Sequence, residues 1–238
     1  MNRNEPGRRD FFRRACWCTL GLAGSTGVLP AFAADGKKSA LTPDEALARL
    51  QKGNAGYLDK PVVSMQDRAR RLEIARGQAP FAVVVGCSDS RVPPEVLFGT
   101  GLGELFTVRN AGNTVDTAAL GTLQYGVAVL GAPLVVVLGH ERCGAVEAAV
   151  AVVEKNATFP GSIGQMVEPI VPAALKARAS GMQGEELLDA AVRENVRRTV
   201  ERLRTSEPLL AEPLRSGKLK IVGGRYDLDD GKVDFFMT

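Results

Sequence analysis

The sequence predicts an α/β fold with a mainly parallel sheet of four to five strands flanked by helices. Two short apolar runs rich in β-branched residues, Phe81–Val85 and Leu134–Leu138, are typical of buried parallel strands and are too short for buried helices. Longer helical segments separate or follow them: Asp116–Leu130 is apolar on most faces, and Glu185–Thr205 has one apolar side. Short buried strands that alternate with helices indicate a parallel sheet with crossover helices.

Length and composition fit one globular domain with an ordinary core. The chain has 238 residues, of which 45% are hydrophobic and 24% charged. Its aromatic content of 5% argues against a stacking surface for nucleic acid. The formal net charge of +3 equals the excess of five arginines over two acidic residues within residues 1–33, so the rest of the chain is formally neutral. We therefore expect no nucleic-acid partner and no acidic-membrane partner for the folded domain.

Residues 1–33 resemble a twin-arginine export signal. Arg8 and Arg9 precede a moderately apolar stretch, Ala15–Leu29, and a small-x-small cleavage site ends at Ala33. The apolar stretch is short and interrupted by small polar residues, which disfavours a stable membrane anchor. We expect cleavage near Ala33, a linker at 34–40, transient contact with the twin-arginine export machinery, and a periplasmic or otherwise exported protein. A disordered basic tail is the alternative.

The domain expected at 41–238 begins with two helices. Thr42 and Glu45 form a capping-box pattern with a proline at the first helical position, and a basic helix is expected from about Gln66 to Arg76. A short helix should begin at Pro93, after the first strand, and Glu104–Val108 should form the next strand.

The second half of the domain contains helices followed by a final pair of strands. Helices are expected from Cys143 to about Glu154 and over Ile163–Ser180. Lys218–Arg225 should return as a strand, and the turn that follows should lead into a last strand at Val233–Phe236.

Residues that bind metals follow the two most apolar strands. Cys87 and Asp89 come after the first strand, and His140 and Cys143 come after the second. Because the carboxyl ends of parallel strands open onto one crevice, these four side chains are expected to converge. Two thiolates and one imidazole suit zinc, and a removable carboxylate from Asp89 can share the fourth position with water.

Asp89 lies two residues before Arg91, so its carboxylate can pair with the guanidinium across the loop. Cys87 and Cys143 are the only cysteines left after removal of the export signal, and a disulfide between them is the main structural alternative. A disulfide would leave Asp89, Arg91 and His140 without a role, which favours the metal site.

The two clusters resemble the signature of the beta-class carbonic anhydrases, in which Cys-Ser-Asp-Ser-Arg, here Cys87–Arg91, is joined to a later His-x-x-Cys. The resemblance extends from about Leu41 to Val233. Further matching stretches are Gly77–Pro80, Leu105–Gly112 and Tyr226–Gly231.

The resemblance implies reversible hydration of carbon dioxide to bicarbonate and a proton, with one zinc per subunit. Asp89 and Arg91 would be catalytic, and Gln78, Phe106 and Gly144 would line the substrate site. It also implies a homodimer or homotetramer, with Gln78 reaching a site across a subunit interface. From the residues alone, Gln78 would be a surface residue in a turn, and the alternative for Phe106 is a buried strand residue.

Other functions remain compatible with these residues. The same scaffold can act on a related linear molecule such as carbon disulfide, or serve as a non-catalytic zinc-binding protein, and an intact Asp89 and Arg91 disfavour a silent binding module. In family members, the aspartate equivalent to Asp89 is either bound to zinc, in a closed state, or paired with the arginine, in an open state. A tryptophan accompanies the closed state in some of them, and the only tryptophan here is Trp17, so we expect the open, paired state.

Overall fold

The computed structural model describes residues 38–60, 67–205 and 207–238, all within the unit Ala33–Thr238. The export signal predicted at 1–33 lies outside the described residues and stays a prediction. Among the described helices, none combines the length and the apolar character that crossing a membrane requires.

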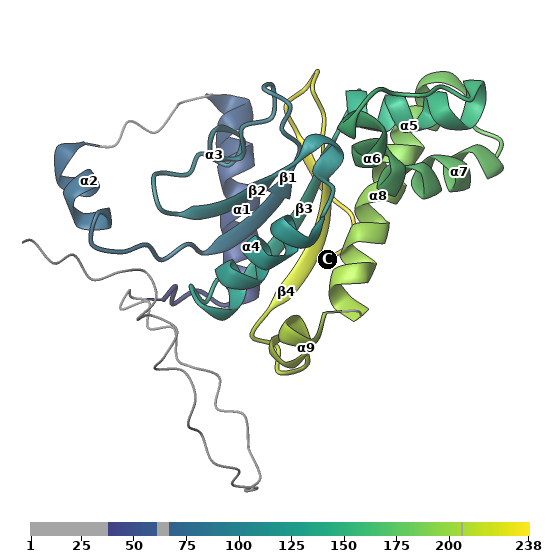
Figure 1. Cartoon of the computed structure of the whole chain (residues 1–238). Helices are drawn as coiled ribbons and strands as arrows, with labels where there is room; N and C mark the ends of the chain where they lie inside the picture. Colours follow the sequence, from purple (N-terminus) through teal and green to yellow (C-terminus); the bar gives the residue numbers. More distant parts are fainter. Residues whose placement is uncertain (1–37, 61–66, 206) are drawn as a thin grey trace, which may run out of the picture. The chain divides into compact units, whose positions relative to one another are not determined.

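Five strands form one sheet in the order β2-β1-β3-β4-β5 (Figure 1). The first four strands of that order run parallel, and the last pairs antiparallel with its neighbour. This arrangement confirms the predicted fold class. The strands are β1 Ala82–Gly86, β2 Leu105–Arg109, β3 Leu134–His140, β4 Lys220–Tyr226 and β5 Val233–Phe235.

The register places the carboxyl ends of the central strands at one edge of the sheet. Gly86 at the end of β1 lies opposite Arg109 of β2 and Leu138 of β3, and His140 lies opposite Tyr226 of β4. All residues of β1 and β3 are buried, so both faces of the sheet need a cover of helices.

Helices cover both faces. One face packs against α1 (Pro43–Asp59) and α3 (Pro94–Leu97), and the other packs against α4 (Thr117–Ala128), α8 (Gly184–Thr205) and α9 (Pro208–Arg215). The predicted capping box at the start of α1 is present. Helix α9 was not predicted from the sequence.

Helix α8 lies directly on the sheet because two glycines leave room for it. A Cβ atom on Gly139 of β3 would lie 2.7 Å from Val196 of α8, and one on Gly223 of β4 would lie 2.8 Å from the same valine. This close approach holds α8 beside the end of β3, where His140 is located.

A third apolar cluster lies beyond the carboxyl edge of the sheet and contains both cysteines of the predicted site. It is built from α5 (Gly144–Lys155), α6 (Ser162–Val167), α7 (Val171–Ala179) and the first half of α8, which gather at one end of the sheet in Figure 1. The site is therefore supported by the sheet on one side and by these helices on the other.

The single helix predicted at Ile163–Ser180 is wrong in its continuity. A 3-10 turn, η3 (Glu168–Ile170), separates α6 from α7. Pro169 and Pro172 lack the backbone N–H of a helix interior and disfavour helical geometry in the residue before them, so each lies near the start of a new segment.

Helix α2 (Arg68–Ile74) is shorter than the predicted segment, whose first residue, Gln66, lies outside the described residues. It buries no residue, and Figure 1 shows it apart from the sheet. Its arginines lie on the surface: Arg68 and Arg71 are exposed and Arg70 is partly exposed.

Candidate metal centre

The metal-binding side chains come from three different elements. Cys87 directly follows β1, His140 is the last residue of β3, and Cys143 is the N-cap of α5. Their ligand atoms all lie within 4.8 Å of one another, and all three residues are buried. The predicted convergence of Cys87, His140 and Cys143 is confirmed, whereas Asp89, the fourth side chain expected there, is not part of this group. The imidazole projects from the strand itself, because β3 continues two residues further than expected.

The cysteines are free thiols with their Sγ atoms 4.0 Å apart. A disulfide requires about 2.05 Å, so the disulfide alternative is not what the structure contains. Two thiolates on one zinc at about 2.3 Å span a tetrahedral edge of roughly 3.8 Å. The observed separation therefore fits two sulfur ligands of a shared ion.

His140 presents one free ring nitrogen. Its Nδ1 lies 2.9 Å from the carbonyl oxygen of Glu141, and because a carbonyl only accepts, Nδ1 carries the proton. Its Nε2 is buried and has no hydrogen-bond partner in the described part of the chain. A neutral imidazole with its second nitrogen fixed by a backbone carbonyl is the usual arrangement of a histidine ligand.

The thiol environment favours a bound cation. Gly112, at φ 67°, donates its N–H to Cys87 Sγ at 3.2 Å. A hydrogen bond from the Cys143 thiol lowers the pKa of Cys87, while the same bond and burial raise the pKa of Cys143. Two buried thiolates this close together repel each other, so a cation bound between them is needed to stabilise both.

Asp89 is paired with Arg91 rather than grouped with the ligands. Arg91 donates from its backbone N–H and Nε to Oδ1, at 2.9 and 3.0 Å, and from Nη2 to Oδ2 at 2.7 Å. The guanidinium holds the pKa of Asp89 at about 2. Oδ2 lies 3.8 Å from His140 Nε2, so a fixed carboxylate faces the free nitrogen in the expected paired state.

Arg109, which was not among the predicted site residues, contacts the segment that carries Cys87 and Asp89. It ends β2, and its guanidinium donates to the carbonyl oxygens of Cys87 at 2.8 Å and Asp89 at 2.7 Å. One side chain therefore fixes the backbone on both sides of Ser88. Its position in the stretch Leu105–Gly112, which carries the resemblance, was the available signal.

Gln78 and Phe106 lie away from the metal cluster of their own chain. Gln78 is exposed in the segment before β1, and β1 alone separates it from Cys87 by about 16 Å. Phe106 lies opposite Val83 in register and three residues before the carboxyl end of β2. Its ring contacts Tyr125 at a centroid distance of 6.1 Å.

Gly144 does lie beside the cluster, as the first residue of α5, and its Cβ position is open. Its backbone N–H is at the amino end of a helix, where anions are favoured.

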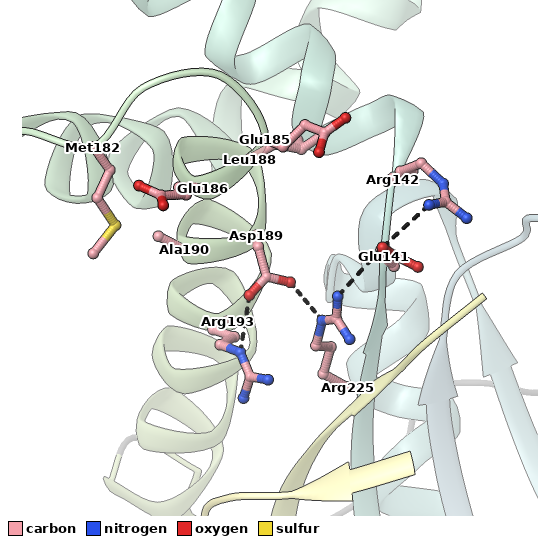
Figure 2. A pocket seen from close by; sticks show the side chains of 10 residues that line it. All are labelled: Glu141, Arg142, Met182, Glu185, Glu186, Leu188, Asp189, Ala190, Arg193 and Arg225. Carbon is pink, nitrogen blue, oxygen red and sulfur yellow. Dashed lines mark hydrogen bonds and ion pairs between the residues drawn. The ribbon is translucent and has the colours of Figure 1, made fainter. Parts of the chain in front are cut away.

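A groove of about 610 Å³ adjoins the loop between His140 and Cys143 (Figure 2). A cluster of three acidic residues, Glu141, Asp227 and Asp229, lies near this groove. All three carboxylates pair with Arg142 or Arg225, so this cluster is an ion-pair network rather than a second metal site.

The features around the cysteines, by contrast, define a zinc metalloenzyme built on an α/β sheet.

Comparison with known proteins gives the same class. The carbonic anhydrase family profile matches residues 82–233. Over 193 residues the chain is 39% identical to a carbonic anhydrase of Mycolicibacterium smegmatis, covering 81% of this chain and 92% of that protein. A Coccomyxa beta-carbonic anhydrase, solved in complex with acetazolamide, superposes with a TM-score of 0.65 at 27% identity, covering 81% of this chain and 86% of that one.

A tetrameric beta-carbonic anhydrase from Sordaria macrospora shares the fold with a TM-score of 0.65 at 24% identity, over 70% of this chain and 85% of that one. The chain belongs to the carbonic anhydrase family. Its activity is the zinc-dependent, reversible hydration of carbon dioxide to bicarbonate and a proton.

Proposed function

We propose that Cys87, His140 and Cys143 bind the catalytic zinc and that Asp89 and Arg91 act on the reacting water. The observation that carries this assignment is the buried, unpartnered Nε2 of His140 within 4.8 Å of both sulfurs, with the Asp89 carboxylate 3.8 Å away. When bound, zinc supplies Lewis-acid activation of water, which makes a nucleophile available near neutral pH.

The chain's own groups orient this chemistry. Arg91 keeps Asp89 ionised and fixes the plane of its carboxylate. Oδ2 of Asp89 would then accept a hydrogen bond from the reacting water and orient a lone pair of that water towards carbon dioxide. Release of the ion pair between Asp89 and Arg91 would free the carboxylate to bind the metal itself and exclude water. Gly144 offers its N–H to the bicarbonate oxygen.

The substrate pocket is proposed to include Gln78 and Phe106 of another subunit. Neither residue reaches the cluster of its own chain, because each precedes the carboxyl edge of the sheet by most of a strand length. A homodimer or homotetramer would bring them to a neighbouring site. The Sordaria macrospora relative is tetrameric, which supports the proposal.

Hydration of carbon dioxide by the zinc-loaded chain, measured beside Cys143→Ser, tests the assignment. The variant should lose zinc and nearly all activity, because serine oxygen is a poor replacement for thiolate. Equal rates would overturn the assignment. A parallel assay with carbon disulfide tests the alternative substrate. Inhibition of carbon dioxide hydration by small anions would reject the alternative of a non-catalytic zinc-binding protein.

We also propose that residues 1–33 direct export by the twin-arginine route and that zinc is loaded before export. The arginine pair, the apolar stretch and the cleavage site near Ala33 support this. Because that route carries folded proteins, the thiols would enter an oxidising compartment already bound to metal. Cell fractionation should find the mature chain in the periplasm and the variant with Arg8→Lys and Arg9→Lys in the cytoplasm. Equal export of both would refute the proposal.

A further inference from the structure

One of the two residues between His140 and Cys143 has an unusual backbone conformation. Arg142 has a φ of 48°, a left-handed conformation that non-glycine residues adopt only when their surroundings compensate. This turn takes the chain from the end of β3 to the start of α5 between two metal ligands. Its geometry therefore determines how far the imidazole lies from the second thiol.

The Arg142 side chain is fixed by the turn after β4. Its Nη1 and Nη2 donate to Oδ2 and Oδ1 of Asp229 at 2.9 and 2.6 Å, a bidentate pair, and Nη1 also reaches Glu141 Oε1 at 3.1 Å. Asp229 is itself positioned, because its N–H donates to Asp227 Oδ1 at 3.0 Å. The pair joins residues 87 positions apart and ties the metal loop to the carboxyl-terminal turn.

The backbone of the same loop contacts both parts of the site. The carbonyl of Glu141 accepts the Nδ1–H of His140, and the carbonyl of Arg142 accepts from Arg91 Nη2 at 3.4 Å. Glu141 in turn accepts the backbone N–H of Leu228 at 3.0 Å, from the turn that carries the Arg142 partner. A shift of this loop would therefore move the imidazole and the guanidinium that orients Asp89.

Figure 2 shows a second connection, from helix α8. Asp189 pairs with both Arg193 and Arg225, and Arg225 reaches Glu141 Oε1 at 3.8 Å. This longer contact ties the loop to α8 less tightly than the bidentate pair ties it to the turn. Among the acidic residues outside the loop, Asp229 is therefore the one whose substitution should free the loop most directly.

We propose that Asp229 is a positioning residue of the metal site: its bidentate pair with Arg142 holds the loop between His140 and Cys143 and thereby slows zinc release. The inference rests on the proposed metal ligands. Side chains of the pair are 46% and 72% exposed, so the pair adds little to global stability. Its effect is local, on the two ligands that flank the loop.

Zinc release from the loaded protein to an excess of a chromophoric chelator measures this effect. Substituting a residue that supports a metal ligand without binding the metal usually changes metal affinity or activity by about 10- to 100-fold. Asp229 acts through one intermediate residue, so Asp229→Asn should release zinc about tenfold faster, at the lower end of that range. The thermal unfolding midpoint of its apoprotein should match that of the wild-type apoprotein, because the exposed pair adds little to global stability.

The matched control is Asp234→Asn, which removes another exposed carboxylate from an arginine pair, with Arg193, in the same carboxyl-terminal segment. It should release zinc at the wild-type rate. Asp229→Glu should restore slow release in part. Arg142→Lys, which loses the bidentate geometry, should also accelerate zinc release. Combining it with Asp229→Asn should accelerate release little further, because the two substitutions remove the same interaction.

Wild-type release rates in Asp229→Asn, or additive effects in the double variant, would overturn the proposal while leaving the ligand assignment intact. A wild-type protein that binds no zinc would instead reject the ligand assignment and, with it, this inference. Equal acceleration in Asp234→Asn would show a general charge effect and would also overturn it.

Discussion

Replacing Arg109 with methionine removes the fork that fixes the first metal ligand. Two hydrogen bonds from a charged donor, at 2.8 and 2.7 Å, to the carbonyls of Cys87 and Asp89 would be lost. Each such bond contributes about 1.5–3 kcal/mol, and because both are only partly buried we expect a loss at the lower end of their sum, roughly 3 kcal/mol. Methionine keeps the length and apolar contacts of the side chain.

The free energy of unfolding in urea and the zinc affinity by chelator competition should both fall in Arg109→Met. Loss of support for a ligand predicts a decrease in affinity of about 10- to 100-fold. Arg204→Met is the matched control, because Arg204 also donates to two backbone carbonyls, those of Ile221 and Met237, but braces α8 against β4. It should lose comparable stability and keep its zinc affinity. Unchanged zinc affinity in Arg109→Met, or an equal loss in the control, would refute the reasoning.

Three further predictions concern acid stability, packing and the thiols. A hydrogen-bonded arginine lowers the pKa of Asp227 from 3.8 to about 2, so its contribution is present above pH 3.8 and is lost as pH falls towards 2; Asp227→Asn should be less stable than wild type at pH 6 and converge with it near pH 2 in urea unfolding, and a constant difference would contradict this. Gly223→Ala should cost about 1–3 kcal/mol in unfolding free energy because its Cβ would lie 2.8 Å from Val196, and Val196→Ala in the same chain should recover part of it. After a chelator has removed zinc from the mature chain, mild oxidation should form a disulfide between Cys87 and Cys143, whose sulfurs are 4.0 Å apart, and leave no thiol that reacts with a thiol reagent. If the apoprotein and the zinc-loaded protein resist this oxidation equally, the two sulfurs do not share a zinc ion.

The metal ligands could be predicted because their position follows from local sequence alone. Cys87, His140 and Cys143 lie at or just after strand ends, and parallel strands bring those ends together whatever the details of packing. The pairing of Asp89 with Arg91 was also predictable, since it spans two residues of one loop.

The supporting residues could not be predicted, because their roles depend on register and on distant turns. Arg109 reaches the first ligand only because β2 pairs with β1 so that it lies opposite Gly86. Asp229 reaches the metal loop across 87 positions of sequence. Both residues lie in stretches that carry the resemblance, Leu105–Gly112 and Tyr226–Gly231, but no local pattern shows which groups they contact.

The same distinction applies to the fold. Strands and amphipathic helices are set by local periodicity and were predicted, whereas α9 (Pro208–Arg215) was missed, since it is short, buries only Leu210 and contains Pro213. The break near Pro169 did have a local signal, the two closely spaced prolines, which the prediction of one continuous helix over Ile163–Ser180 did not take into account.

X-ray absorption at the zinc edge of the loaded mature chain tests the central claim most directly. We expect about two sulfur scatterers near 2.3 Å together with nitrogen or oxygen scatterers at about 2.0–2.1 Å, and about one sulfur fewer in Cys143→Ser if zinc is retained. A zinc shell of nitrogen and oxygen alone, or protein that hydrates carbon dioxide without bound zinc, would contradict the account.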